Sequence, residues 1–358
     1  MNVDEKYMLR CLELADCGRG HVSPNPMVGA VVVCDGKIIG EGYHREYGKA
    51  HAEVNAIASV ADEEQLKRST IYVSLEPCSH YGKTPPCAEL IIKKQIPKVV
   101  VASLDPFPAV SGNGVKMLRD AGIDVTVGLL EKEAIWLNKE FITAQTKQRP
   151  YIYLKWAESS DGFIDITRNN PSTPPTVLSD ARNARRVHKL RSEVAAIMVG
   201  SNTAYLDNPS LTVRHWHGKN PIRIVLDREG KLPNNLNLFD NSVKTIVFTE
   251  QDKEDSTNIE YVKIEFNDEL LPNILTELNR RKVSSLLVEG GAKLLDSFIN
   301  ADLWDEAIIE TSSVKLYKGI KSPTLEGVLT ENTSETDRIL RKYLNKSAFD
   351  FFFISSES

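Results

Sequence analysis

Two short stretches decide the fold of the first half of this chain: His51-Ala52-Glu53 and Pro77-Cys78-Ser79-His80-Tyr81-Gly82-Lys83-Thr84-Pro85-Pro86-Cys87. His51, Cys78 and Cys87 offer one imidazole and two thiolates, a set of soft ligands that suits zinc with a fourth position left open. Glu53 lies two residues after the histidine. It can reach the open position without being a ligand, so it is placed to move protons. The pattern therefore predicts a catalytic zinc centre.

Local patterns place these ligands at the starts of two helices. Residues 52–60 predict a helix, residues 69–75 a strand, and residues 87–95 a second helix with Pro86 at its first position. The partial positive charge of a helix N-terminus favours a thiolate and an ionised water. A simpler interpretation is a pair of buried thiols beside a hydrogen-bonded histidine. It would explain a lone His-x-Glu, but not this whole helix–strand–helix order.

The His-x-Glu and Pro-Cys pattern resembles the signature of the zinc deaminases. Deaminases of nucleosides and nucleic acids usually continue as Pro-Cys-x-x-Cys, whereas eight residues separate Cys78 from Cys87 here. This spacing, and the loop Pro24-Asn25-Pro26-Met27-Val28-Gly29, are similar to those of the riboflavin-pathway pyrimidine deaminases. The resemblance implies that ring and phosphate of a pyrimidine substrate are held by Asn25, His44, His80 and Lys83.

Composition limits the class of protein. A chain of 358 residues is long enough for two domains, and its net charge of −5 argues against a nucleic-acid partner. No apolar run reaches the ~18 residues of a membrane span. Five cysteines, an odd number in a long chain, do not suggest a disulfide scaffold. We therefore expect a cytoplasmic protein that acts on a small molecule, with no nucleic acid and no membrane.

The first domain is expected to be an α/β/α sandwich of the cytidine-deaminase type. Its other expected elements are a helix at 4–15, a hairpin of strands at 28–34 and 37–43, a strand at 98–103, a helix at 114–121, a strand at 124–127 and one long helix at 131–148. Pro150 follows that last helix, so we place the domains at 1–148 and 149–358.

The second domain alternates strands and helices without any further cysteine. Its expected strands are 151–157, 195–199, 222–227, 244–249, 260–266, 286–289, 306–311 and 349–354, with a loop at 163–176, a helix at 180–193 and another at 268–282. Ser179 is expected to cap the helix at 180–193. Gly290-Gly291 lies between a strand and a helix, where free N–H groups can hold a phosphate, although a plain tight turn has the same pattern.

Two motifs in this half resemble the reductase domain of the bifunctional riboflavin enzymes, which is related in fold to dihydrofolate reductase. They are Lys155-x-x-x-Ser159-x-Asp161-Gly162 and the Thr203 to Arg214 stretch, TAYLDNPSLTVR. The resemblance implies that substrate is bound by Lys155, Arg191, Leu211, Arg214 and Glu289. It implies that the cofactor NADPH is bound by Glu158, Thr203, Asp207, Gly291, Ala292, Lys293, Leu294, Leu295, Asp296 and Ser297.

Taken together, the resemblances cover nearly the whole chain and imply one bifunctional enzyme of riboflavin biosynthesis. The first domain, with one zinc ion per chain, would hydrolyse the 2-amino group of a diaminopyrimidinone that carries a phosphoribosylamino arm, with Glu53 as the proton carrier. The second domain would reduce the ribosyl arm to ribityl with NADPH. A homo-oligomer, dimer or tetramer, is also expected.

Two competing classes deserve comparison. A polynucleotide base deaminase would need a basic groove with stacking aromatic side chains. Both the acidic net charge and the cysteine spacing of this chain argue against that class. A zinc deaminase whose C-terminal half is a non-catalytic oligomerisation or regulatory module stays open. Val177-Leu178-Ser179 stands where the family often has Trp-Ile-Ser or Trp-Ile-Thr, and Phe107 stands where it often has Asn.

Overall fold

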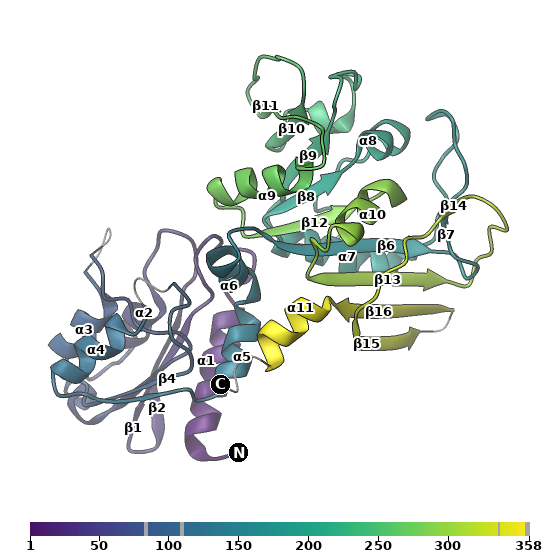
Figure 1. The fold of residues 1–358 in the computed structure, drawn as a ribbon. Coiled ribbons are helices and arrows are strands. Elements are labelled where there is room, and N and C mark those ends of the chain that lie inside the picture. Colours follow the sequence, from purple (N-terminus) through teal and green to yellow (C-terminus); the bar gives the residue numbers. More distant parts are fainter. Residues whose placement is uncertain (82–84, 108–110, 336, 355–358) are drawn as a thin grey trace. The chain divides into compact units, whose positions relative to one another are not determined.

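A computed structural model of the chain describes residues 1–81, 85–107, 111–335 and 337–354. It divides into two compact units, Met1–Lys147 and Gln148–Ser358, each built on its own sheet (Figure 1). Both units combine a sheet with helices, which confirms the predicted α/β class. Among the described residues, no helix is both long and apolar enough to span a bilayer.

The first unit is organised around a mixed five-stranded sheet in the order β2-β1-β3-β4-β5. Its strands are β1 (Gly29–Cys34), β2 (Lys37–Tyr43), β3 (Thr70–Val73), β4 (Lys98–Val101) and β5 (Asp124–Val127). β1 runs antiparallel to β2 and β3, whereas β3, β4 and β5 run parallel. The carboxyl end of β3, which leads to Cys78, therefore lies next to that of β4.

Helices cover both faces of this sheet. On one face lie α2 (Ala52–Ala58), α3 (Cys87–Lys93) and α4 (Asn113–Asp120), which bury Ala56, Ile91 and Leu118 against the strands. On the other face lie α1 (Val3–Asp16) and α5 (Glu131–Leu137), which bury Met8 and Ala134. A 3-10 helix, η1 (Glu63–Arg68), links α2 to β3. The predicted α/β/α layout is confirmed.

One expectation in the first unit is wrong: the helix at 131–148 is not continuous. α5 ends at Leu137 and α6 (Lys139–Thr146) begins after Asn138, whose φ of −99° and ψ of 21° interrupt the helix. Asn138 is buried, and its side-chain amide bonds both the N–H and the carbonyl of Met27 at 2.8 and 2.9 Å. We attribute the break to this anchoring, since asparagine readily exchanges helical bonding for bonds to other backbone.

The second unit carries a nine-stranded sheet in the order β11-β10-β9-β8-β12-β6-β13-β16-β15. The strands are β6 (Tyr151–Glu158), β8 (Ala196–Val199), β9 (Ile222–Leu226), β10 (Thr245–Thr249), β11 (Ile259–Lys263), β12 (Ser285–Glu289), β13 (Glu306–Ser312), β15 (Val328–Glu335) and β16 (Arg338–Leu344). In this sheet order, the seven strands from β11 to β13 are parallel to one another. β16 pairs antiparallel with β13, and β15 pairs antiparallel with β16. Parallel strands put their carboxyl ends on one edge, where ligands bind in such sheets.

Helices flank this sheet as well. α9 (Leu270–Arg280) and α10 (Ala292–Asn300) bury Leu275 and Phe298 in the main core. α7 (Ala181–Glu193) reaches Glu289 and Glu310, whose neighbours in sequence face that core, so α7 lies on the opposite face. The second unit also contains α8 (Ser201–Asp207), η2 (Asn237–Phe239) and a small sheet of β7 (Phe163–Asp165) and β14 (Ile320–Lys321).

Several local predictions need correction. Residues 349–354 do not form a strand: α11 (Lys346–Phe349) runs into a π-helical segment, η3 (Asp350–Ile354), after Asn345 caps its start. Asp180, not Ser179, caps α7, because Ser179 donates its hydroxyl to Glu310 instead. Pro86 is the residue before α3 rather than its first residue, and β7 lies within the expected loop at 163–176.

Candidate active sites

Three soft donors meet where α2 and α3 begin. His51 directly precedes α2, Cys87 is the first residue of α3, and Cys78 lies on the segment after β3. Nδ1 of His51 lies 3.6 Å from Sγ of Cys78 and 3.4 Å from Sγ of Cys87. Ordinary zinc bond lengths in a tetrahedral site put nitrogen and sulfur ligands about 3.6 Å apart. The donors therefore fit a zinc ion with one position left for a non-protein ligand.

Glu53 sits in the first turn of α2 beside these donors, with only 3% of its surface exposed. Burial, together with the negative charge of Cys78, raises the pKa of its carboxyl to about 7. A group with a pKa near neutral pH can both accept and release a proton at modest cost. Glu53 thus has the environment of a general acid–base group.

His44 and Asn25 lie next to the same donors. Nδ1 of His44 is 3.1 Å from the carbonyl oxygen of Ala50, and its Nε2 is 3.2 Å from the side-chain nitrogen of Asn25. The His44 ring meets that of His51 edge-on, with 5.5 Å between centroids. Burial lowers the pKa of His44, so the neutral ring donates to Ala50 and accepts from Asn25.

The other two residues expected to hold the pyrimidine are placed differently. His80 is exposed on the segment that carries Cys78, close enough to the carboxyl of Asp105 to interact with it electrostatically. Lys83 lies outside the described residues. The structure therefore brings together Asn25, His44 and the zinc donors.

Glu76 was missed by the sequence analysis. Its buried carboxylate accepts hydrogen bonds from three backbone N–H groups, those of Asp105, Gly112 and Val115, at 3.1, 2.9 and 3.0 Å. It thereby ties the start of α4 and the segment after β4 to the strand end that carries Cys78. The signal in the sequence was a glutamate directly after the expected buried strand at 69–75, because a buried carboxylate needs hydrogen-bond donors.

Gly114 completes this junction by close approach. A Cβ at Gly114 would lie 2.0 Å from the carbonyl oxygen of Pro77, the residue before Cys78. Only glycine allows α4 to pack this near the backbone that carries the metal ligand. The position of Cys78 therefore depends on a helix that supplies no ligand itself.

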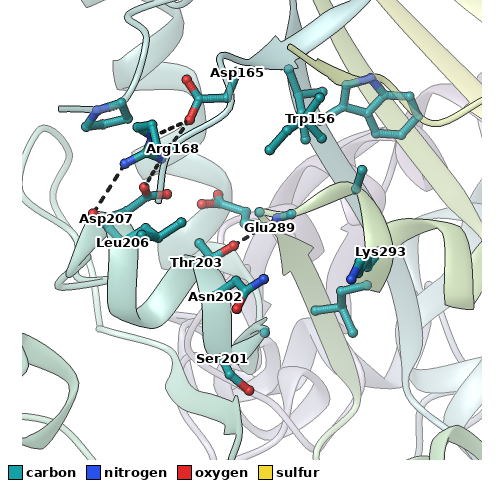
Figure 2. Close-up of a pocket in the computed structure, with 18 of the residues that line it drawn as sticks. Trp156, Asp165, Arg168, Ser201, Asn202, Thr203, Leu206, Asp207, Glu289 and Lys293 are labelled. Atoms are coloured by element: carbon teal, nitrogen blue, oxygen red, sulfur yellow. Dashed lines mark hydrogen bonds and ion pairs between the residues drawn. The ribbon is translucent and has the colours of Figure 1, made fainter. Parts of the chain in front are cut away.

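The second unit contains a cavity of about 840 Å³ at the carboxyl ends of the parallel strands (Figure 2). It is lined by these predicted substrate and cofactor residues: Lys155, Thr203, Asp207, Glu289, Gly291, Ala292, Lys293, Leu294 and Ser297. Pro175 and Val177 also line it, and Val177 is 80% exposed where the family often carries a tryptophan.

Arg191 and Glu289 form an ion pair at one end of this cavity. Nη2 of Arg191 lies 2.6 Å from Oε2 of Glu289, and each side chain is only 12% exposed. Burial alone would raise the pKa of Glu289, but Arg191 and Lys155 lower it, so the carboxylate stays ionised. Arg191 also reaches the carbonyl oxygen of Thr212 at 3.4 Å. It thus connects Glu289 with the segment that carries Leu211 and Arg214.

Three predicted cofactor residues do not line the cavity. The carboxylate of Glu158 accepts hydrogen bonds from Trp156 and Thr311. Leu295 is fully buried in the core under α10. Asp296 follows it on the same helix, outside the cavity lining.

The glycine turn after β12 leads directly into the start of α10. Gly290 adopts a φ of +99°, a conformation that favours glycine, and the N–H of Gly291 donates to Oγ1 of Thr203 at 2.9 Å. α10 begins at Ala292, so its unpaired N–H groups face the turn. The hydrogen bond from Gly291 to Thr203 fixes α8, which carries Thr203, against the start of α10.

Arg168 is a further residue that the sequence analysis missed. Figure 2 shows it between Asp165 and Asp207, with which it forms ion pairs, and its side chain is only 5% exposed. It links the loop after β7 to the end of α8, and both line the cavity. Its position in a stretch expected to be an irregular loop gave no signal.

Comparison with known proteins identifies the family to which this chain belongs. Residues 1–103 match the model for the cytidine and deoxycytidylate deaminase zinc-binding region, and residues 150–316 match the model for the RibD C-terminal domain. Riboflavin biosynthesis protein RibD of Aquifex aeolicus is 42% identical over 316 residues, which are 86% of each chain. The chain belongs to the RibD family. The RibD of Escherichia coli is 37% identical over 324 residues, again 86% of each chain.

A solved structure supports the same membership. The diaminohydroxyphosphoribosylaminopyrimidine deaminase/5-amino-6-(5-phosphoribosylamino)uracil reductase of Thermotoga maritima superposes with a TM-score of 0.87 at 37% identity, covering 96% of this chain and 99% of that one. As a RibD-family member, this protein is a bifunctional deaminase and reductase of riboflavin biosynthesis. Its first domain is zinc-binding, and its reductase domain indicates a nicotinamide cofactor.

Proposed function

We propose that the first unit hydrolyses the 2-amino group of a diaminopyrimidinone with a phosphoribosylamino arm. The second unit then reduces the ribosyl arm of the deaminated product with NADPH. The observation that carries the first step is the meeting of His51, Cys78 and Cys87 beside the buried carboxyl of Glu53. The T. maritima relative is named for both steps.

In the deaminase step, His51, Cys78 and Cys87 would hold a zinc ion, which would supply an electrophile that makes water a stronger acid. Glu53 takes a proton from the attacking water and returns it to the departing amino group, which leaves as ammonia. Asn25 offers a donor and an acceptor to the pyrimidine edge, and His44 fixes that amide by its hydrogen bond.

In the reductase step, bound NADPH supplies a hydride. The start of α10, which follows the turn at Gly290-Gly291, binds the cofactor diphosphate through its backbone N–H groups. The ring oxygen of the ribosyl arm takes a proton as its bond to the carbon that receives the hydride breaks, and Lys155 supplies positive charge to that oxygen. Glu289 is held for substrate contact by Arg191. Arg214 is expected to bind the substrate phosphate.

We assign the deaminase to residues 1–148 and the reductase to residues 149–358. The division of the chain into compact units near residue 148 supports this assignment. We also propose a cytoplasmic location, since none of the five cysteines, all of which the structure describes, is in a disulfide, as is usual in a reducing compartment. A homo-oligomer, dimer or tetramer, stays a prediction that light scattering would check.

A pair of variants tests the proposal. Glu53→Gln, loaded with zinc, should release ammonia at least ~10²-fold more slowly than wild type and still reduce deaminated substrate. Lys155→Ala should release ammonia normally and fail to oxidise NADPH. Loss of both activities in either variant would contradict two separate sites, and normal ammonia release by zinc-loaded Glu53→Gln would remove Glu53 from the reaction.

A further inference from the structure

His188, on α7, is a buried histidine to which neither proposed reaction assigns a role. Only 5% of its surface is exposed, and it lies three residues before Arg191 on the same helix. Burial lowers its pKa to about 4, and the positive charges of Arg191 and Arg214 act in the same direction. Glu289 also interacts with it electrostatically. His188 therefore lies among three of the side chains that are expected to serve the substrate.

Nδ1 of His188 has one defined hydrogen bond. It accepts from the backbone N–H of Arg214 at 2.8 Å. Because a backbone N–H only donates, Nδ1 carries no proton, and the low pKa keeps the ring neutral at neutral pH. A protonated ring would turn a second donor towards that N–H and break the bond. His188 is therefore suited to hold the backbone of Arg214 in place, and not to give a proton to the substrate.

The segment that carries Arg214 lies along one face of α7. The ring of His215 meets that of His188 edge-on, with 4.7 Å between their centroids. One helical turn further on, Gly218 approaches Ser192 so closely that an added Cβ would lie 2.5 Å from the Cβ of the serine. Positions four residues apart share a helix face, so both contacts are made by the same side of α7. The helix therefore sets the path of the chain on the C-terminal side of Arg214.

The backbone on the N-terminal side of Arg214 is fixed as well, whereas its guanidinium is available. The N–H of Val213 donates to Oδ1 of Asn220 at 2.7 Å, and Arg191 holds the carbonyl oxygen of Thr212. The side chain of Arg214 is exposed, and Nη1 donates to Oγ1 of Thr212 at 3.2 Å. Within the part of the chain that the structure describes, the guanidinium has no other hydrogen-bond or ion-pair partner. A fixed backbone lowers the cost of ordering such a group around an anion.

We propose that His188 is a positioning residue of the reductase, whose Nδ1 holds the backbone of Arg214 so that the guanidinium meets the phosphate of the deaminated substrate. This inference rests on the proposed binding of that phosphate by Arg214. The phosphate and the carbon that receives the hydride are at opposite ends of the ribosyl arm. His188 therefore acts on the affinity for phosphorylated substrate, and the rate at saturating substrate should not depend on it.

The test measures NADPH oxidation by the full-length, zinc-loaded protein with deaminated pyrimidine, with and without its phosphate. Arg214→Ala should raise the KM for the phosphorylated substrate about 10- to 100-fold, the range of a hydrogen bond to a charged group. His188→Leu should raise it about 10-fold, weaken inhibition by inorganic phosphate equally, and leave kcat within about twofold of wild type. The KM for the unphosphorylated substrate should not change. His188→Asn, which keeps an acceptor where Nδ1 stands, should restore most of the affinity.

A double variant shows whether His188 acts through Arg214. His188→Leu combined with Arg214→Ala should have the KM of Arg214→Ala alone, because no guanidinium is left to position. His217→Leu, which removes an exposed histidine of the same segment, is the matched control and should behave as wild type. If His188→Leu does not fold, His188→Gln replaces it in every comparison, because its longer side chain carries the oxygen away from the position of Nδ1. A wild-type kcat shows that the second unit of a variant is folded.

Failure of this inference can be told apart from failure of the proposed function. If Arg214→Ala raises the KM for the phosphorylated substrate but His188→Leu does not, or if the two effects multiply in the double variant, the assignment of His188 is wrong while the role of Arg214 stands. The assignment is also wrong if His188→Leu impairs both substrates equally or lowers kcat. If Arg214→Ala keeps the wild-type KM for the phosphorylated substrate, the proposed role of Arg214 fails and the inference fails with it.

Discussion

Replacing Glu53 by glutamine should stabilise the metal-free protein, and only above a definite pH. Burial raises the pKa of this carboxyl from 4.5 to about 7, so the native state holds its proton more tightly than the unfolded state does. The contribution of this carboxyl to the free energy of unfolding is therefore fully present below pH 4.5 and is lost as pH rises towards 7. At 1.36 kcal/mol per pKa unit, the loss amounts to about 3 kcal/mol. Glutamine does not ionise, so the variant does not undergo this loss of stability.

The measurement is urea unfolding of chelator-treated wild type and Glu53→Gln from about pH 4.5 to about pH 8, followed by hydrogen exchange in peptides of the first unit. The stability of Glu53→Gln relative to wild type should grow by about 3 kcal/mol across this range and become constant above about pH 7. Glu133→Gln, at an exposed glutamate of α5, is the control and should show no such growth. A difference that does not vary with pH would refute the argument that burial destabilises the Glu53 carboxylate.

Three further predictions follow from the two sites. Cys78→Ser should lose zinc and ammonia release together while NADPH oxidation persists; full zinc by metal analysis would remove Cys78 from the ligand set. Gly114→Ala places a methyl group 2.0 Å from the Pro77 carbonyl, so it should cost about 1–3 kcal/mol and speed zinc loss to a chelator; unchanged zinc retention would contradict the positioning role. Arg191→Ala should destabilise the second unit by about 3 kcal/mol, since Glu289 is left buried and unpaired, and abolish reduction; wild-type melting and turnover would show that the pair is dispensable.

The metal site could be predicted because its information is local. His51 and Glu53 begin one helix, Cys78 follows a strand, and Cys87 begins the next helix, so spacing alone brings the donors to one edge. The same locality explains why the hairpin of β1 and β2 was placed correctly. The role of the buried Glu76 depends instead on N–H groups that lie 29, 36 and 39 residues away along the chain, which no short motif reveals.

Errors occurred where distant contacts override local preference. Residues 349–354, FDFFFI, have the aromatic composition of a strand, yet Asn345 caps a helix that begins before them, and Phe352 packs against Tyr151. β15 and β16 were missed because their polar side chains hide the alternation that marks a strand. The break at Asn138 arises from its bonds to Met27, far away in sequence.

In the reductase cavity, too, local motifs could be predicted from the sequence, whereas contacts between distant residues could not. Glu289 and the glycines after it could be placed at a strand end from sequence, because β12 is a continuous apolar run followed by Gly290-Gly291. Arg168 could not, since its partners Asp165 and Asp207 meet only when the loop after β7 folds against α8.

The central claim is that one chain carries two chemistries in sequence, and product analysis tests it most directly. Wild-type protein loaded with zinc is incubated with the diaminopyrimidinone phosphate, with and without NADPH, and the products are analysed by mass spectrometry. Without NADPH, the only product should be the one in which an oxygen replaces the amino group. With NADPH, a second product carrying two additional hydrogens should accumulate. Reduced product that retains the amino group, or no reduced product at all, would contradict the account.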